Sequence, residues 1–232
     1  MNLKRDKVYL FFSGIKFIMK NFFIFLVLFI FLFAIGKSYS MELNTKLVNK
    51  IIVLDAGHGG KDGGTSANGI YEKDVNLDIV LLLKNELIKS GATVILTRDG
   101  DYDLSSPNTN RRKKSDFDNR IKLINNSKAD LYISIHMNYL ENPKYYGAQV
   151  FYTESNKLLA NVIQESLKSY LNTPMDEKEL SNTIYMYKQL EIPGVLIECG
   201  FLSNAKERDL LVDKEYQKRI VNAIIKGIVA FY

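Results

Sequence analysis

The two histidines carry the clearest chemical signal, because the 232-residue sequence contains no others and each follows an apolar run. His58 comes shortly after the run Ile51 to Leu54, and His136 directly follows Leu131 to Ile135. A single histidine is more often a core or surface residue than a metal ligand. If both runs are parallel strands, however, their carboxyl ends meet at one edge of the sheet, where two imidazoles can bind one ion such as Zn²⁺.

Two glutamates could complete such a site. Catalytic zinc usually takes three protein ligands and leaves a fourth position for water, and two histidines with one glutamate form a recurrent set. Glu72 lies at the start of the next predicted helix, where an acid could equally stabilise the helix dipole, so spacing alone leaves both interpretations open. Glu198 ends the apolar run Val195 to Ile197, where an unpaired buried carboxylate would be costly. Beside a zinc-bound water, Glu198 has a role as general base.

Two other kinds of site fit the sequence less well. The glycines at 57, 59, 60, 63 and 64 could form a phosphate-binding loop, but neither a Walker pattern nor G-x-G-x-x-G is present, which favours a tight turn around a metal. Cys199 and His136 could form a cysteine-hydrolase pair. Because Cys199 directly follows Glu198, it points to the opposite face of an extended strand, which favours structural burial.

Three further positions have interpretations that stay open. The basic run Arg111 to Lys114 is typical of a solvated face, or it could bind carboxylates of an anionic substrate. Asp55 and Asn138 stand next to the histidine segments and are candidates to orient the metal ligands from behind.

Apolar, β-branched runs alternate with helical patterns along the chain, which indicates the α/β class. We expect strands at 51–54, 93–97, 131–135, 148–152, 183–187 and 195–197, and helices at 75–88, 117–124, 157–170 and 216–231. The predicted fold is a single domain with a six-stranded, mostly parallel, twisted sheet flanked by helices on both faces. Residues 99–114 are the one long irregular segment expected, a surface loop flanking the site.

The positive net charge of +5 is confined to the N-terminal segment. Residues 1–40 carry six basic side chains and one acidic one, and the remaining 192 residues are balanced, which argues against a nucleic-acid binder. A basic start followed by the apolar run Phe22 to Ile35 is typical of an export signal or a membrane anchor. We therefore expect a signal peptide or anchor at 1–40, a linker at 41–49 and a catalytic domain at 50–232. The single cysteine excludes an intramolecular disulfide.

Four sequence blocks together resemble the zinc-dependent N-acetylmuramoyl-L-alanine amidases of the type-3 amidase family. The blocks are Asp55 to Gly60, Glu72 to Asn76, Ser134 to Asn138, and Glu198 to Asn204. The resemblance implies that His58, Glu72 and His136 bind zinc and that Glu198 is catalytic. It also implies hydrolysis, by zinc-activated water, of the amide between the N-acetylmuramoyl lactyl group and L-alanine in peptidoglycan.

A narrower likeness extends to the CwlD-type, germination-specific members of this family. It rests on the segments Asp101 to Leu104, Arg111 to Asp116, Asn119-Arg120 and Gly147 to Tyr152. It implies a role in spore-cortex maturation, with the forespore envelope as one location. The N-terminal segment itself indicates export to the outside of the cytoplasmic membrane, as a secreted or anchored protein with membrane contact through that segment alone. The alternatives are a vegetative cell-wall autolysin of the same chemistry and a non-catalytic peptidoglycan-binding domain. The need for an accessory protein stays open.

Overall fold

The structure is a computed structural model that describes residues 19, 21–33, 46–180 and 184–232. Residues 21–33 are helical, and their large apolar side chains are exposed. Among the described residues, no helix combines the length and the apolar character needed to cross a membrane. The expected export signal or anchor at 1–40 otherwise lies outside the described residues, so it stays a prediction.

Residues Lys46–Tyr232 form a compact unit built around one sheet of six strands in the order β4-β1-β5-β8-β6-β7. Strands β4, β1, β5 and β8 run parallel to one another, whereas β6 pairs antiparallel with β8. The sheet strands are β1 (Ile51–Ala56), β4 (Thr93–Leu96), β5 (Leu131–Asn138), β6 (Gln149–Tyr152), β7 (Lys178–Glu179) and β8 (Gly194–Phe201). The predicted α/β class with a mostly parallel six-stranded sheet is confirmed.

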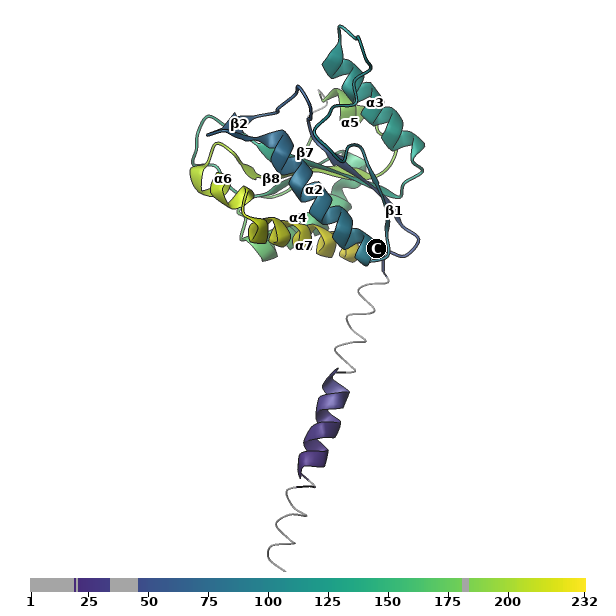
Figure 1. Cartoon of the computed structure of the whole chain (residues 1–232), viewed down its shortest axis with the longest axis vertical. Coiled ribbons are helices and arrows are strands. Elements are labelled where there is room, and N and C mark those ends of the chain that lie inside the picture. The colour runs from purple at the N-terminus through teal and green to yellow at the C-terminus, as the bar shows by residue number, and fades with distance from the viewer. Residues whose placement is uncertain (1–18, 20, 34–45, 181–183) are drawn as a thin grey trace, which may run out of the picture. The chain divides into compact units, whose positions relative to one another are not determined.

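Helices cover both faces of this sheet (Figure 1). One face carries α2 (Glu72–Lys89), α4 (Lys157–Leu171) and α7 (Lys214–Phe231); the other carries α3 (Arg112–Asn126) and the short α5 (Tyr185–Lys188). The remaining elements are β2 (Ser66–Ala67), β3 (Ile70–Tyr71), the 3₁₀ turn η1 (Glu154–Asn156) and α6 (Ala205–Leu211). Connections between parallel strands pass through helices, as parallel pairing requires.

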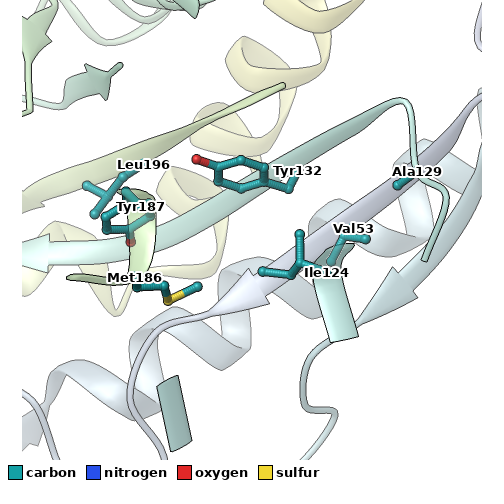
Figure 2. Packing of buried hydrophobic residues seen from close by; sticks show 7 residues of the cluster. All are labelled: Val53, Ile124, Ala129, Tyr132, Met186, Tyr187 and Leu196. Carbon is teal, nitrogen blue, oxygen red and sulfur yellow. The ribbon is translucent and has the colours of Figure 1, made fainter. Parts of the chain in front are cut away.

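Apolar side chains that alternate along the strands supply both cores. Ile52 and Leu54 are fully buried with Ile79 and Leu83 of α2. The intervening side chain, Val53, belongs to a cluster under α3 and α5 that Figure 2 shows. Its members are Val53, Ile124, Ala129, Tyr132, Met186, Tyr187 and Leu196. Burial on both faces explains why the central strands have continuous apolar sequences.

The structure corrects two boundaries. The expected strand at 183–187 is wrong, because Tyr185–Lys188 is a short helix and the edge strand of the sheet is Lys178–Glu179 instead. Met186 and Tyr187 are nevertheless buried, which explains the strand-like apolar pattern. The expected linker 41–49 is too long, since Leu47 is fully buried and the compact unit begins at Lys46. Residues 41–45 of that linker lie outside the described residues.

Candidate metal centre

Three side chains converge at the carboxyl ends of β1 and β5. His58, Glu72 and His136 each offer one ligand atom, and these atoms lie within 4.8 Å of one another. Glu72 Oε1 is 3.2 Å from His58 Nε2 and 2.9 Å from His136 Nδ1. A tetrahedral ion bound at 2.0–2.1 Å separates its ligand atoms by about 3.3 Å, so the donor set and spacing fit Zn²⁺. The structure thus brings together the three residues that the sequence singled out as ligands.

His58 is held in a tight turn after β1. Its backbone φ is +61°, a left-handed conformation that is uncommon outside glycine. Its second ring nitrogen, Nδ1, lies 3.0 Å from Asp62 Oδ2. A carboxylate on the outer nitrogen of a liganding imidazole fixes the ring and its tautomer, so Nε2 is left facing Glu72. Although burial opposes it, hydrogen bonding to Glu72 raises the pKa of His58 above its ordinary value. Sequence reasoning missed Asp62, whose only signal is its place four residues after His58.

Glu72 is the first residue of α2, and its side chain is 2% exposed. Its second oxygen, Oε2, accepts from the backbone amide of Thr65 at 2.9 Å, while Oε1 also accepts from the amide of Met137 at 3.2 Å. Burial alone would raise the pKa of Glu72, but hydrogen bonds from His136 and His58 hold it well below its usual range. The carboxylate is therefore kept charged and aimed at both imidazoles.

Glu198 joins the site from the neighbouring strand. It pairs in register with His136 across the parallel β5–β8 pairing, which places the two side chains on the same face of the sheet. Within the described part of the chain, its carboxylate oxygen Oε2 is buried without a hydrogen-bond partner. Burial is the main cause that raises the pKa of Glu198 to about 7. A carboxyl group with that pKa can take up and release a proton near neutrality.

Two glycines leave room for these rings. A Cβ on Gly57 would lie 2.2 Å from Cε1 of His136, and one on Gly64 would lie 2.5 Å from Glu72 Oε2. Both contacts are shorter than any side chain tolerates, so the loop must carry glycine where it passes the ligands. This agrees with the expectation that the glycine-rich segment turns tightly around a metal.

Two buried arginines donate hydrogen bonds to the backbone that carries the site residues. Arg120 on α3 donates to Asp55 Oδ1 at 2.5 Å, to Asp116 Oδ2 at 3.0 Å and to the carbonyl of His58 at 2.6 Å. Arg98 follows β4 and donates to the carbonyl oxygens of Ala56 and Gly57. Sequence reasoning missed Arg98, because nothing local distinguishes a cation after a strand from a surface residue.

The expected supporting residues divide into two groups. Asp55 contacts Arg120, Thr97 and Ser134, and it therefore reaches His58 through Arg120 and not directly. Asn138 accepts from the amide of Tyr139 at 2.8 Å, so its side chain belongs to the loop that follows β5.

Asn76, which was not singled out for a role, instead lies beside the ligands. It donates to the carbonyl of Gly57 at 3.0 Å and lies 3.5 Å from Glu72 Oε1.

Arg112 of the basic run 111–114 lines a cleft with Gly60 and Lys61, and Lys113 is close enough to Asp62 for its charge to act on that carboxylate. Arg112 pairs with Asp103, and Lys114 pairs with Asp118 at 2.7 Å, so these two cations are engaged on the protein surface.

Cys199 is fully buried, on the face opposite Glu198. Burial raises the pKa of its thiol well above the ordinary value, which is unsuited to a nucleophile.

A polar cleft of about 520 Å³ borders the glycine-rich loop that follows β1. Gly60 and Lys61 form one side, and the irregular segment that contains Asp101, Tyr102 and Asp103 forms the other. Asp101 fixes this segment to the loop, because it accepts from the amide of Gly60 at 2.8 Å and pairs with Lys73 at 2.8 Å. The segment therefore flanks the glycine-rich loop as expected, but it is shorter than the predicted range 99–114, because α3 already begins at Arg112.

Known proteins resemble this chain over nearly all of the compact unit. The germination-specific N-acetylmuramoyl-L-alanine amidase of Bacillus subtilis is 40% identical over 214 residues, covering 89% of this chain and 90% of the relative. The amidase LytC of B. subtilis is 31% identical over 206 residues, which cover 86% of this chain and 39% of LytC.

Solved structures agree with these relatives. The CwlD amidase of Clostridioides difficile, solved in complex with the GerS lipoprotein, superimposes with a TM-score of 0.75 and 44% identity, covering 79% of this chain and 98% of that one. The catalytic domain of CwlV, an amidase of Bacillus (Paenibacillus) polymyxa var. colistinus, gives 0.69 with 31% identity over 78% and 97% of the two chains. A family model for N-acetylmuramoyl-L-alanine amidase matches residues 52–230. The chain belongs to the N-acetylmuramoyl-L-alanine amidase family.

Proposed function

We propose that the chain hydrolyses the amide bond between the lactyl group of N-acetylmuramic acid and L-alanine in peptidoglycan. The observation that carries this is the convergence of His58, Glu72 and His136 next to Glu198, a carboxylate whose buried Oε2 has no hydrogen-bond partner among the described residues. Membership of the amidase family specifies which amide is cut. A non-catalytic peptidoglycan-binding domain would need neither the ligand set nor the carboxyl group.

The three converging side chains would hold one Zn²⁺. When bound, this ion supplies a water of lowered pKa and stabilises negative charge on the carbonyl oxygen of the substrate. Asp62 keeps the ring of His58 oriented, and the amides of Thr65 and Met137 keep the carboxylate of Glu72 in place.

Glu198 would move the proton that hydrolysis requires. An amide is an unreactive acyl group with a poor leaving amine, so both the attacking water and the leaving nitrogen need assistance. The unpartnered Oε2 of Glu198 would accept the proton of the attacking water. The same carboxyl group would then donate that proton to the nitrogen of L-alanine as the carbon–nitrogen bond breaks. Its pKa of about 7 suits both transfers near neutral pH.

The biological substrate would be the peptidoglycan of the spore cortex. The similarity to the germination-specific amidase of B. subtilis extends over 90% of that relative, whereas the similarity to LytC extends over only 39% of LytC. Vegetative wall turnover by the same chemistry is the second candidate, and the LytC similarity is what favours it. In the cortex, removal of the peptide frees a muramic acid for conversion to its lactam. A normal content of muramic lactam after deletion of the protein in its host would therefore exclude the cortex role, while the amidase activity could still stand.

The chain would act outside the cytoplasmic membrane, where peptidoglycan lies, with export directed by the basic and apolar N-terminal segment. An accessory lipoprotein is a candidate partner, because the CwlD amidase of C. difficile was solved in complex with the GerS lipoprotein.

Product analysis tests the proposed activity directly. The zinc-loaded protein should release peptides with a free L-alanine amino group from purified peptidoglycan and leave intact glycan strands with free lactyl carboxyl groups. Mass spectrometry separates these products from those of a glycosidase or an endopeptidase. Unchanged peptidoglycan, or cleavage at any other bond, contradicts the proposal; a parallel reaction with added candidate lipoprotein controls for a missing partner.

A further inference from the structure

Arg98 is the most unusual buried side chain near the site. It is 1% exposed, and its guanidinium donates to four backbone carbonyls. Nε reaches the carbonyl of Ala56 at 2.9 Å, Nη1 reaches that of Gly100 at 2.9 Å, and Nη2 reaches those of Gly57 at 3.0 Å and Lys73 at 2.7 Å. All three nitrogens of the fork therefore donate to the main chain.

No carboxylate pairs with Arg98 among the residues that the structure describes. Arg120, which is equally buried, differs in this respect because it pairs with Asp55 and Asp116. Burying a guanidinium without a carboxylate partner is costly, and Arg120 nearby adds repulsion. Burial and that repulsion lower the pKa of Arg98 from its ordinary value, although the charges of Asp55, Asp101 and Asp74 act in the opposite direction. The contacts of the guanidinium indicate what it contributes to the site.

The two carbonyls bound by Nη2 identify this contribution. Gly57 directly precedes His58, and Lys73 directly follows Glu72. One nitrogen atom thus joins the backbone beside one candidate ligand to the backbone beside another. The side chain of Arg98 also lies under Gly59, where an added Cβ would be 3.0 Å from its Cδ and Nε. The guanidinium is in contact with the loop on both sides of His58.

We propose that Arg98 is a positioning residue of the metal centre, which fixes the separation of His58 and Glu72 by binding the main chain next to each of them. This rests on the proposed metal-dependent function. The planar fork matters as much as the charge, because three nitrogens in one plane reach four carbonyls that a single ammonium cannot reach together. Arg98 touches neither substrate nor the reacting atoms.

Substitution of Arg98→Lys in the full chain tests this, since it keeps the charge and removes the fork. Competition with a chromogenic chelator should show Zn²⁺ bound ~10- to 100-fold more weakly than by the wild type, the usual range for residues that orient metal ligands. Arg219→Lys is the matched control, because Arg219 also donates to a backbone carbonyl, that of Tyr170, but far from the site. That variant should bind Zn²⁺ as the wild type does.

The thermal midpoint of the metal-free proteins separates positioning from general support. A merely structural role would lower the midpoint of Arg98→Lys and leave its zinc affinity equal to that of the wild type, and this result overturns the proposal. If the wild type itself binds no zinc, it is the proposed function that fails.

If Arg98→Lys does not fold, hydrogen exchange in metal-free wild type decides. The amides of Gly57 and Gly59 donate to Ile135 and Asp62, and both should stay protected without metal if the loop is held by Arg98. Exchange at the rate of an unstructured chain would overturn the proposal.

Discussion

Glu198 lies directly beside His136, its partner residue across the parallel pairing of β5 with β8. The two strands occupy central positions in the sheet, so a proton-accepting carboxyl group and a candidate metal ligand share one rigid support. Because the two side chains belong to different strands, either one can be substituted without displacing the other.

Glu198→Gln should retain zinc and the native fold while turnover of peptidoglycan falls by ~10² or more, the usual contribution of general acid–base catalysis. The amide has nearly the shape of the carboxyl group but cannot accept the proton. Turnover is measured as free L-alanine amino groups released, and zinc by elemental analysis of the same sample. Near-normal turnover in a zinc-replete sample would show that another group moves the proton.

His136→Ala should lose the metal, because two remaining ligands do not hold a catalytic ion firmly. Asp62→Asn should have a smaller effect, since it removes a contact behind His58 and leaves all three ligands in place. The zinc content after dialysis should be highest in the wild type, lower in Asp62→Asn and lowest in His136→Ala. One equivalent of zinc retained by His136→Ala would mean that the assignment of ligands is wrong.

Gly57→Ala should weaken zinc binding, because the added methyl group would lie 2.2 Å from the ring of His136 and must displace it. Gly63→Ala in the same loop is the control. Its methyl group meets only the half-exposed ring of Tyr71 at 3.1 Å, which can move aside. Chelator competition on both variants gives the comparison, and equal affinities would argue against close packing between the loop and His136.

The free energy of unfolding should fall in acid as Asp55 is protonated. Burial alone would raise the pKa of Asp55, but Arg120 and Ser134 hold it to about 2, below the ordinary value of 3.8. A lowered folded-state pKa contributes stability that is present above about pH 4 and is lost as the pH falls towards 2, by about 2 kcal/mol.

Urea unfolding of metal-free protein between pH 6 and 2.5 measures this loss, and comparison with Asp55→Asn isolates the part due to Asp55. The difference in unfolding free energy between wild type and variant should shrink as the pH falls. A difference that is independent of pH would contradict the role of the Asp55–Arg120 pair.

A chain that begins at Lys46 should fold and bind zinc, since the compact unit begins there and holds every candidate site residue. A chain that begins at Lys50 should fold less stably, because it lacks Leu47, whose side chain is fully buried. By analogy with deletion of buried leucines, the difference should be ~2 to 5 kcal/mol in unfolding free energy. Equal stability of the two chains would place the start of the domain after Leu47.

The central strands and long helices could be predicted from sequence because their patterns are local. The strand Ile51–Ala56 begins with four apolar residues, Leu131–Asn138 is mostly apolar up to Ile135, and Lys214–Phe231 is amphipathic along its whole length. The edge of the sheet could not be predicted. Lys178–Glu179 is exposed and pairs through its main chain alone, whereas the apolar segment around Met186 and Tyr187 is buried as a single helical turn.

The two histidines could be named because few residue types bind zinc and the sequence contains only two of them, whereas Glu72 was assigned through the resemblance to the amidase family. The residues that hold these ligands in place could not be predicted. Arg98 lies 41 residues from Gly57 and 25 from Lys73, and Asp55 is 65 residues from Arg120. Contacts at such separations depend on how the elements pack, which a pattern along the chain does not contain.

The candidate ligands belong to three segments of the chain: the turn after β1, the start of α2 and the end of β5. An ion held by all three would act as a cross-link that closes the chain between His58 and Glu72 and again between Glu72 and His136, which are 64 residues apart. Because the unfolded chain lacks this cross-link, each increase in free zinc would shift the folding equilibrium towards the native state. A low concentration of zinc outside the cell would then make the protein more susceptible to proteolysis as well as inactive.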